Sequence, residues 1–139
     1  MKSKTIILSI HPCHIEKIFS GDKLYEYRKV APLEIQNIVI YATSPIKKIV
    51  AIIEVDKILT NTPNTIWEQT NRYAGVSKDF FMEYFRNKEK AFAIHFKTIH
   101  KLNMPKPLSA IGIKQAPQSY IYIDDSFNLC KNSVTTKIG

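Results

Sequence analysis

A lysine, a glutamate and an arginine stand close together in one short segment, at Lys23, Glu26 and Arg28. Side chains alternate between the two faces of a strand, which would place Glu26 and Arg28 on one face and two tyrosines on the other. Charged side chains on a packing face are costly unless they pair or line a cleft. Gathered at a cleft, these groups suit a ligand rich in hydrogen-bond acceptors, such as a phosphate or a nucleobase edge.

Two interpretations of this segment stay open from the residues alone. Lys23 has the wrong parity to share the face of Glu26 in a regular strand. It joins Glu26 and Arg28 only if the turn at Gly21 and Asp22, or a bulge, redirects it. In the second interpretation, Glu26 and Arg28 form a surface ion pair on a hairpin, which contributes little to stability.

The segment also resembles a known signature. The order Ser-Gly-x-Lys-x-x-Glu-x-Arg over residues 20–28, preceded by a predicted short helix, is similar to the signature of the ASCH domain family. Residues 40–45, 49–55, 75–85 and 116–120 resemble further blocks of that family in the same order, so the resemblance runs from about Ile6 to Ile123. It implies an α+β fold of the PUA-like superfamily, a curled, mostly antiparallel β-barrel with helices packed on it, and an association with RNA.

The elements that would position these residues follow from periodicity and from helix end signals. Pro12 and Gly21 are typical of the first and last turns of one helix, while Thr62 and Ser77 are suitable N-caps for two more. We therefore expect a single curled antiparallel sheet, with helices after its first and fourth strands. The predicted strands are residues 5–10, 24–30, 37–43, 48–59, 91–99 and 119–123. The predicted helices are residues 12–21, residues 62–75 and a third helix within residues 77–87.

Length and composition predict one domain with its own core, since the chain has 139 residues and a hydrophobic content of 45%. We place this domain at residues 1–124 and expect the patternless tail, 125–139, to be mobile. No apolar run reaches the length of a membrane span, and the first residues do not resemble a signal peptide. Cys13 and Cys130 are far apart in sequence and are expected as reduced thiols, which favours a cytoplasmic protein.

The charge balance favours a polyanionic partner. Twenty Lys and Arg residues against twelve Asp and Glu give a formal net charge of +8. Such a balance attracts nucleic acid at long range and through counterion release, although many basic domains are merely soluble. The doublet of Lys47 and Lys48 is the predicted pair of phosphate contacts.

Two loops offer further ligand contacts. Tyr41 and Ser44 stand where the third predicted strand ends, and Gln118 and Ser119 follow a proline. A tyrosine ring stacks on a base, and an amide reads a base edge with both a donor and an acceptor. Ordinary turn chemistry is the alternative for all four, but the resemblance implies a cleft between the signature strand and neighbouring loops.

Other groups carry weaker signals. His11, Cys13 and His14 are close enough to suggest a metal, but a structural site needs four ligands and no second pair follows, so we predict no metal and no cofactor. A stripe of aromatic residues at 81, 84 and 85 is interpreted as core.

Two functions follow. In the first, the domain binds RNA or a modified nucleoside: Lys23 and Arg28 contact phosphate or base acceptors, Glu26 accepts from an exocyclic amine, and Tyr41 stacks. In the second, the resemblance implies a hydrolase with Lys23 and Glu26 as catalytic candidates, either a ribonuclease or an amidohydrolase of N4-acetylcytidine.

The sequence matches the residues that the amidohydrolase interpretation requires only in part. Such enzymes carry a threonine where this chain has Glu26, and only Glu68 in the following helix could supply their carboxylate. A lysine that acts as a base also needs a lowered pKa, which an adjacent glutamate opposes. Binding is therefore our first prediction.

Overall fold

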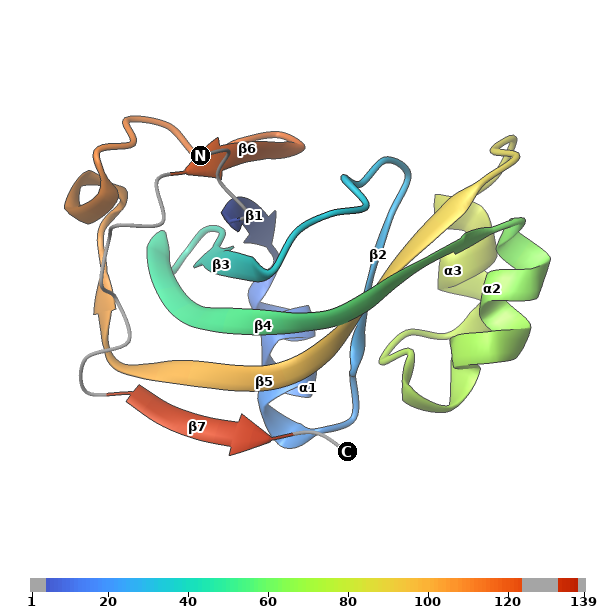
Figure 1. Cartoon of the computed structure of the whole chain (residues 1–139), viewed down its shortest axis with the longest axis horizontal. Coiled ribbons are helices and arrows are strands. Elements are labelled where there is room, and N and C mark those ends of the chain that lie inside the picture. The colour runs from blue at the N-terminus through green and yellow to red at the C-terminus, as the bar shows by residue number, and fades with distance from the viewer. Residues whose placement is uncertain (1–4, 124–132, 138–139) are drawn as a thin grey trace.

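The computed structural model describes residues 5–123 and 133–137, and the side chains of the first of these ranges. Long, curved strands β4 (Lys48–Asn61) and β5 (Ala91–Lys106) run side by side across the molecule, with α2 and α3 at one end and β6 at the other (Figure 1). The remaining elements are β1 (Thr5–Ile10), α1 (Pro12–Ser20), β2 (Tyr25–Arg28), β3 (Asn37–Ala42), α2 (Pro63–Thr70), η1 (Asn71–Tyr73), α3 (Lys78–Tyr84), η2 (Leu108–Ile111), β6 (Tyr120–Ile123) and β7 (Ser133–Lys137).

All strands belong to one curled sheet in the order β2-β5-β4-β3-β1-β6. β7 stands outside this order and pairs with β5, at residues that follow those paired with β2. The pairs are antiparallel except β1 with β3, which is parallel, so the α+β prediction of a mostly antiparallel sheet is confirmed. A purely antiparallel sheet was wrong, because α1 and β2 carry the chain back before β3 begins. Three register shifts between β4 and β5 provide the bulges that bend the sheet.

All three α-helices begin within one residue of the predicted start, and α1 ends within one residue of its predicted end. Gly21 follows α1 in the left-handed conformation (φ 88°) and donates its backbone N–H to the last carbonyls of the helix. Ser77 caps α3 through a hydrogen bond from the N–H of Phe80. The second helix is shorter than predicted and ends at Thr70, because the Asn71 side chain takes up carbonyl oxygens of the last turn and the chain continues as η1.

Two differences concern the strands. β5 continues to Lys106, seven residues beyond the predicted end at Ile99, since it pairs with β4 and β7 along that extension. β7 lies in the predicted tail and pairs Ser133–Lys137 with the middle of β5. Residues 124–132 and 138–139 of that tail, with Cys130, lie outside the described part of the chain.

Three apolar clusters hold the elements together. The largest lies under α1, where Ile15 and Ile18 pack on inward-facing residues of the central strands. A second covers the other face of β1 and β3, and η2 closes it. A third joins α2 and α3 to Tyr27 of β2, whose ring meets Phe81 edge-on with centroids 4.8 Å apart. The third cluster fixes the distance between β2 and α3, the two elements that face the site described below.

Gly75 illustrates how tightly the link between α2 and α3 packs against the turn after α1. Its backbone is left-handed (φ +71°), and an added Cβ would lie 2.5 Å from Cβ of Lys23. Gly21 is also left-handed (φ +88°), but an added Cβ would meet nothing within 4 Å.

The two glycines form a matched test. Gly21→Ala bears only the cost of a left-handed alanine and should lower the free energy of unfolding by about 1 kcal/mol. Gly75→Ala bears that cost and the collision with Lys23, and should lower it by about 3 kcal/mol. Urea unfolding of both variants measures the difference. Equal losses would contradict the close packing of Gly75 on Lys23.

Candidate functional site

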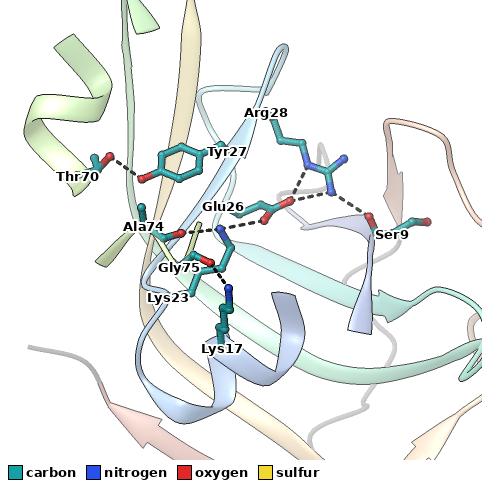
Figure 2. A network of polar contacts seen from close by, with 9 residues as sticks. All are labelled: Ser9, Lys17, Lys23, Glu26, Tyr27, Arg28, Thr70, Ala74 and Gly75. Atoms are coloured by element: carbon teal, nitrogen blue, oxygen red, sulfur yellow. Dashed lines mark hydrogen bonds and ion pairs between the residues drawn. The ribbon is translucent and has the colours of Figure 1, made fainter. Parts of the chain in front are cut away.

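The turn between α1 and β2 buries the side chain of Lys23, which is 2% exposed. The backbone of Lys23 forms an isolated β-bridge with Ala74, which holds the turn against the link between α2 and α3. Its Nζ donates to the Ala74 carbonyl at 3.0 Å and lies 3.9 Å from Oε1 of Glu26 (Figure 2). The turn therefore brings Lys23 to the carboxylate despite its parity, as the cleft interpretation required.

Glu26 and Arg28 form a largely buried ion pair rather than a surface ion pair. Both Nε and Nη2 of Arg28 lie 2.9 Å from Oε2 of Glu26, and their side chains are 16% and 10% exposed. Nη2 also donates to the Ser9 carbonyl at 3.0 Å, which ties β2 to the end of β1. The surface-pair interpretation is wrong, because both side chains are largely removed from solvent and line a cavity that α3 also borders.

These charged groups line a cavity of about 190 Å³. β1, α1, the turn and β2 contribute the polar and charged groups, together with Ile10 and Tyr27, while α3 and the residue before its cap contribute only apolar and aromatic side chains. Phe80, one of these aromatic residues, is 52% exposed. The lining residues are Ser9, Ile10, His11, His14, Lys23, Glu26, Tyr27, Arg28, Val76, Phe80, Phe81 and Tyr84.

Burial lowers the pKa of Lys23 below its ordinary value. Glu26 raises that pKa, but its effect is smaller than the cost of desolvating the ammonium, and Lys17 and Arg28 add to the lowering. The expectation that Glu26 opposes a lowered pKa was right in direction, and burial outweighs it. The ammonium group of Lys23 therefore gives up its proton more easily than the ammonium group of an exposed lysine does.

Two neighbouring rings have shifted pKa values for the same reason. Burial and the charge of Lys23 lower the pKa of His14, whose Nδ1 is buried without a hydrogen-bond partner among the described residues. Burial raises the pKa of Tyr27 to about 12, and its hydroxyl lies 2.6 Å from Oγ1 of Thr70 on α2. His14 therefore lines the cavity as a ring that holds a proton less readily than an exposed histidine, and Tyr27 serves as an anchor between β2 and α2.

A second group of candidate residues lies at the ends of β1 and β3, and we call it the strand-end group: Ser9, Tyr41, Ser44, Gln118 and Ser119. Ser9 is opposite Tyr41 in the parallel β1–β3 pair, and its hydroxyl donates to the Pro117 carbonyl at 2.9 Å. In the antiparallel β1–β6 pair, Leu8 lies opposite Tyr120, and Ser119 stands in the loop just before β6. Ser9 and Tyr41 thus lie side by side on neighbouring strands, and the loop of Pro117 and Ser119 lies close to Ser9.

The sequence analysis placed both groups in one cleft, and the structure separates them. Tyr41 is 8% exposed in the second apolar cluster, and Ser44, Gln118 and Ser119 lie outside the cavity lining. Lys47 and Lys48 are exposed at the turn into β4 and do not line the cavity either. Ser9 connects the two groups, because its carbonyl binds Arg28 and its hydroxyl binds the loop of Pro117.

Of the twelve lining residues, the sequence analysis named Lys23, Glu26 and Arg28 as site residues, and three of those that it missed show why. Ser9 was predicted only as part of the strand 5–10, although a serine near the end of an apolar run indicates a polar group that could contribute to a site. Tyr84 was assigned to a core stripe, and it lines the cavity beside its buried neighbour Phe81. Phe80 carried no signal, because its role depends on where α3 docks.

The residues weighed for metal or hydrolase chemistry lie as follows. His11 is the N-cap of α1, where its Nδ1 accepts from the N–H of Cys13. Within the described residues, no three His, Cys, Asp or Glu side chains are placed to hold a metal ion. Glu68 is exposed on α2 and does not line the cavity. No helix among the described residues is long and apolar enough to span a membrane.

The lowered pKa of Lys23 predicts how stability changes with pH. Between the folded value and the ordinary value of 10.5, the unfolded chain binds more protons than the folded chain, so stability rises with pH there. The free energy of unfolding of the native protein, relative to Lys23→Met, should therefore increase as the pH approaches about 10.5. Urea unfolding across alkaline pH measures this difference, and a decrease would mean that Glu26 outweighs burial.

Comparison with known proteins places this geometry in a family. The ASCH domain model matches residues 8–100. An ASCH domain-containing ribonuclease of Zymomonas mobilis is 30% identical over 125 residues, which cover 86% of this chain and 84% of that protein. ATP synthase subunit alpha and large ribosomal subunit protein uL22 of Ureaplasma parvum are 27% and 26% identical over 88% and 87% of this chain. The chain spans only 16% and 40% of those two longer proteins.

Solved structures agree with the fold. The crystal structure of ASCH from Zymomonas mobilis matches with a TM-score of 0.82 and 27% identity, over 98% of this chain and 99% of that one. Two variants of the same protein, one with a serine changed to alanine and one with a tyrosine changed to phenylalanine, each match with a TM-score of 0.80 and 28% identity, over 89% and 88% of this chain and 91% of theirs. On the family match and the extent of these likenesses, the chain belongs to the ASCH domain family.

Proposed function

We propose that this protein binds single-stranded RNA and that the cavity between β2 and α3 holds one unpaired base. The observation that carries this proposal is the division of the cavity into an aromatic side and a charged side. Proteins recognise unpaired bases by stacking them on aromatic rings while polar groups bind the base edge. The family's ribonuclease in Zymomonas mobilis supports RNA as the class of ligand.

The size of the cavity fits a single base. Its volume of about 190 Å³ exceeds the ~150 Å³ that encloses a benzene ring and falls short of the several hundred Å³ typical of drug-sized ligands. Half-exposed Phe80 leaves a ring face that a ligand can cover. A base inserted from a single strand would therefore leave its sugar and phosphate outside.

The strand-end group gives the rest of the RNA a path. Ser9 joins the charged groups of the cavity to the loop of Pro117, where Gln118 and Ser119 are exposed, and Ser44, Lys47 and Lys48 are exposed at the turn after β3. Hydroxyl groups and lysines are the usual contacts to phosphate and ribose. Tyrosine and serine are also the residue types exchanged in the two Zymomonas variants.

A second candidate function is RNA cleavage, which one observation favours. Lys23 is buried with a lowered pKa, so a neutral amine is available at lower pH than in an exposed lysine. Such an amine can accept the proton of a ribose 2′-hydroxyl as that oxygen forms a bond to the adjacent phosphorus. The bond from phosphorus to the 5′-oxygen then breaks, and the departing oxygen takes the proton back from the lysine ammonium, which leaves a 2′,3′-cyclic phosphate and a free 5′-hydroxyl. The amidohydrolase alternative has less support, since Glu68 is exposed and stands outside the cavity lining.

The salt dependence of binding tests the RNA partner. A single-stranded RNA octamer should lose affinity steeply with added salt, because its release of counterions drives binding to a chain of charge +8. Lys47→Ala or Lys48→Ala should weaken all sequences alike and reduce the slope of log K against log salt by about 0.7. Fluorescence anisotropy at several salt concentrations measures both effects. An affinity indifferent to salt would indicate a neutral ligand instead.

Lys23 variants separate binding from cleavage. Lys23→Arg keeps the charge but cannot release its proton, so RNA affinity should stay within a few-fold while any RNA cleavage is lost. Lys23→Met removes the charge and should weaken binding about tenfold, which corresponds to about 1.4 kcal/mol. Gel analysis of labelled RNA measures cleavage, and anisotropy measures affinity.

Exposed Lys97 supplies the control for these variants, since Lys97→Arg changes the same atoms on the outside of β5. Thermal melting establishes that each variant is folded. Cleavage that persists in folded Lys23→Arg would exclude Lys23 as the base, and unchanged affinity in Lys23→Met would remove Lys23 from the binding site.

A further inference from the structure

Lys17, in the last turn of α1, bonds to two separate segments that border the cavity. Its backbone carbonyl accepts from the N–H groups of Asp22 and Lys23, both at 3.0 Å, which fixes the turn that carries Lys23. Its Nζ donates to the Gly75 carbonyl at 2.9 Å, in the link between α2 and α3 (Figure 2). We infer that Lys17 is a positioning residue of the RNA site, which holds the aromatic side of the cavity at a fixed distance from the charged side. The inference rests on the proposed function and assigns a role in it to this lysine.

The link that Lys17 holds leads directly into the aromatic side of the cavity. Val76, which follows Gly75, lines the cavity, and α3 begins two residues later. Phe80, Phe81 and Tyr84 of this one helix complete that side. An isolated helix of 7 residues is not stable in water, so the position of α3 depends on the contacts that anchor it. The link at its start is one of these anchors.

Two lysines hold consecutive carbonyl groups of this link. Lys23 donates to the Ala74 carbonyl at 3.0 Å, and Lys17 donates to the Gly75 carbonyl at 2.9 Å. Lys23 is buried and lines the cavity, so a ligand would meet it directly. Lys17 is exposed and, within the described part of the chain, does not belong to the cavity lining. Its effect on a ligand in the cavity therefore passes through Gly75.

The close packing at Gly75 makes the position of the link matter to the site. The link lies directly on the stem of Lys23, since a Cβ added to Gly75 would lie 2.5 Å from Cβ of Lys23. A shift of the link therefore changes the spacing between Lys23 and the aromatic side. The apolar contacts of the third cluster are not directional and tolerate small shifts of α3. A hydrogen bond is directional, so the bond from Lys17 favours one position of the link.

The strength of one hydrogen bond limits the effect that the loss of Lys17 can have. If the bond favours the position of the link that binds a base, its removal lowers the fraction of molecules in that position. The apparent affinity then falls by the same factor as that fraction. One hydrogen bond changes such a population by about tenfold at most. We therefore expect Lys17→Met to weaken binding about fivefold.

The experiment compares two kinds of ligand on the native protein and on Lys17→Met. The first is a 2′-O-methyl RNA octamer of mixed sequence, which has no 2′-hydroxyl to support cleavage, measured by anisotropy at several salt concentrations. The second is each of the four free ribonucleosides, titrated by NMR. A positioning role predicts the same loss, about fivefold, for octamer and nucleosides, with the slope of log K against log salt unchanged. A phosphate contact by Lys17 would instead lower that slope by about 0.7 and leave the nucleosides unaffected.

Further variants serve as controls. Lys97→Met, the same change at an exposed position on β5, should alter the affinity for neither ligand. Lys17→Arg keeps a cationic donor and should retain most of the affinity. Thermal melting establishes that each variant is folded, and Lys17→Ala takes the place of Lys17→Met if that variant does not fold, since alanine favours a helix. A lower melting temperature without weaker nucleoside binding would mean that Lys17 only stabilises the fold, and would overturn the inference.

The two ligands separate this inference from RNA binding. An octamer that binds the native protein and folded Lys17→Met equally well, or with a lowered slope in the variant, would overturn the positioning role while RNA binding stands. Where only the octamer binds, a fivefold loss with an unchanged slope supports the role. Nucleosides that bind Lys17→Met more weakly than the native protein, without any binding of the octamer, would support the positioning role and overturn RNA binding. Binding of neither ligand to the native protein would overturn both.

Discussion

A buried ammonium group imposes the constraint on which the site depends. Lys23 is 2% exposed, and a charge at that depth is tolerated only with hydrogen bonds and a counter-charge. The Ala74 carbonyl supplies the first and Glu26 the second. Glu26 is in turn held by Arg28, and Arg28 by the Ser9 carbonyl. This chain of contacts joins the link after α2 to β2 and to the end of β1, so removal of one member leaves another charge uncompensated.

The same constraint explains the local backbone. Gly75 has no side chain where the stem of Lys23 passes, and Gly21 turns the chain so that Lys23 leaves the strand and faces Ala74. Tyr27 completes the arrangement from the opposite face of β2, since its ring lies 4.9 Å from Nζ of Lys23 and its hydroxyl contacts Thr70. The cavity is therefore preorganised, and a ligand would meet charged groups whose positions are already fixed.

The chain belongs to the ASCH family, and its Ureaplasma relatives carry the matched region within much longer chains. Within the described part of the chain, the cavity is lined by β1, α1 and the residue before it, the turn, β2, and α3 with the link that precedes it. The long β4 and β5 contribute the sheet on which those elements are mounted.

The sequence by itself determined the features that depend on neighbours along the chain. Pro12, Gly21 and Ser77 marked helix ends through local hydrogen bonding, and the two-residue period of β2 paired Glu26 with Arg28. Only the tertiary structure decided that Lys23 is buried, because its partner Ala74 is 51 residues away. It also decided that β1 and β3 are parallel, that Phe80 borders the cavity, and that Tyr41 lies apart from it. These outcomes depend on register and docking between distant segments, for which a single sequence contains no local signal.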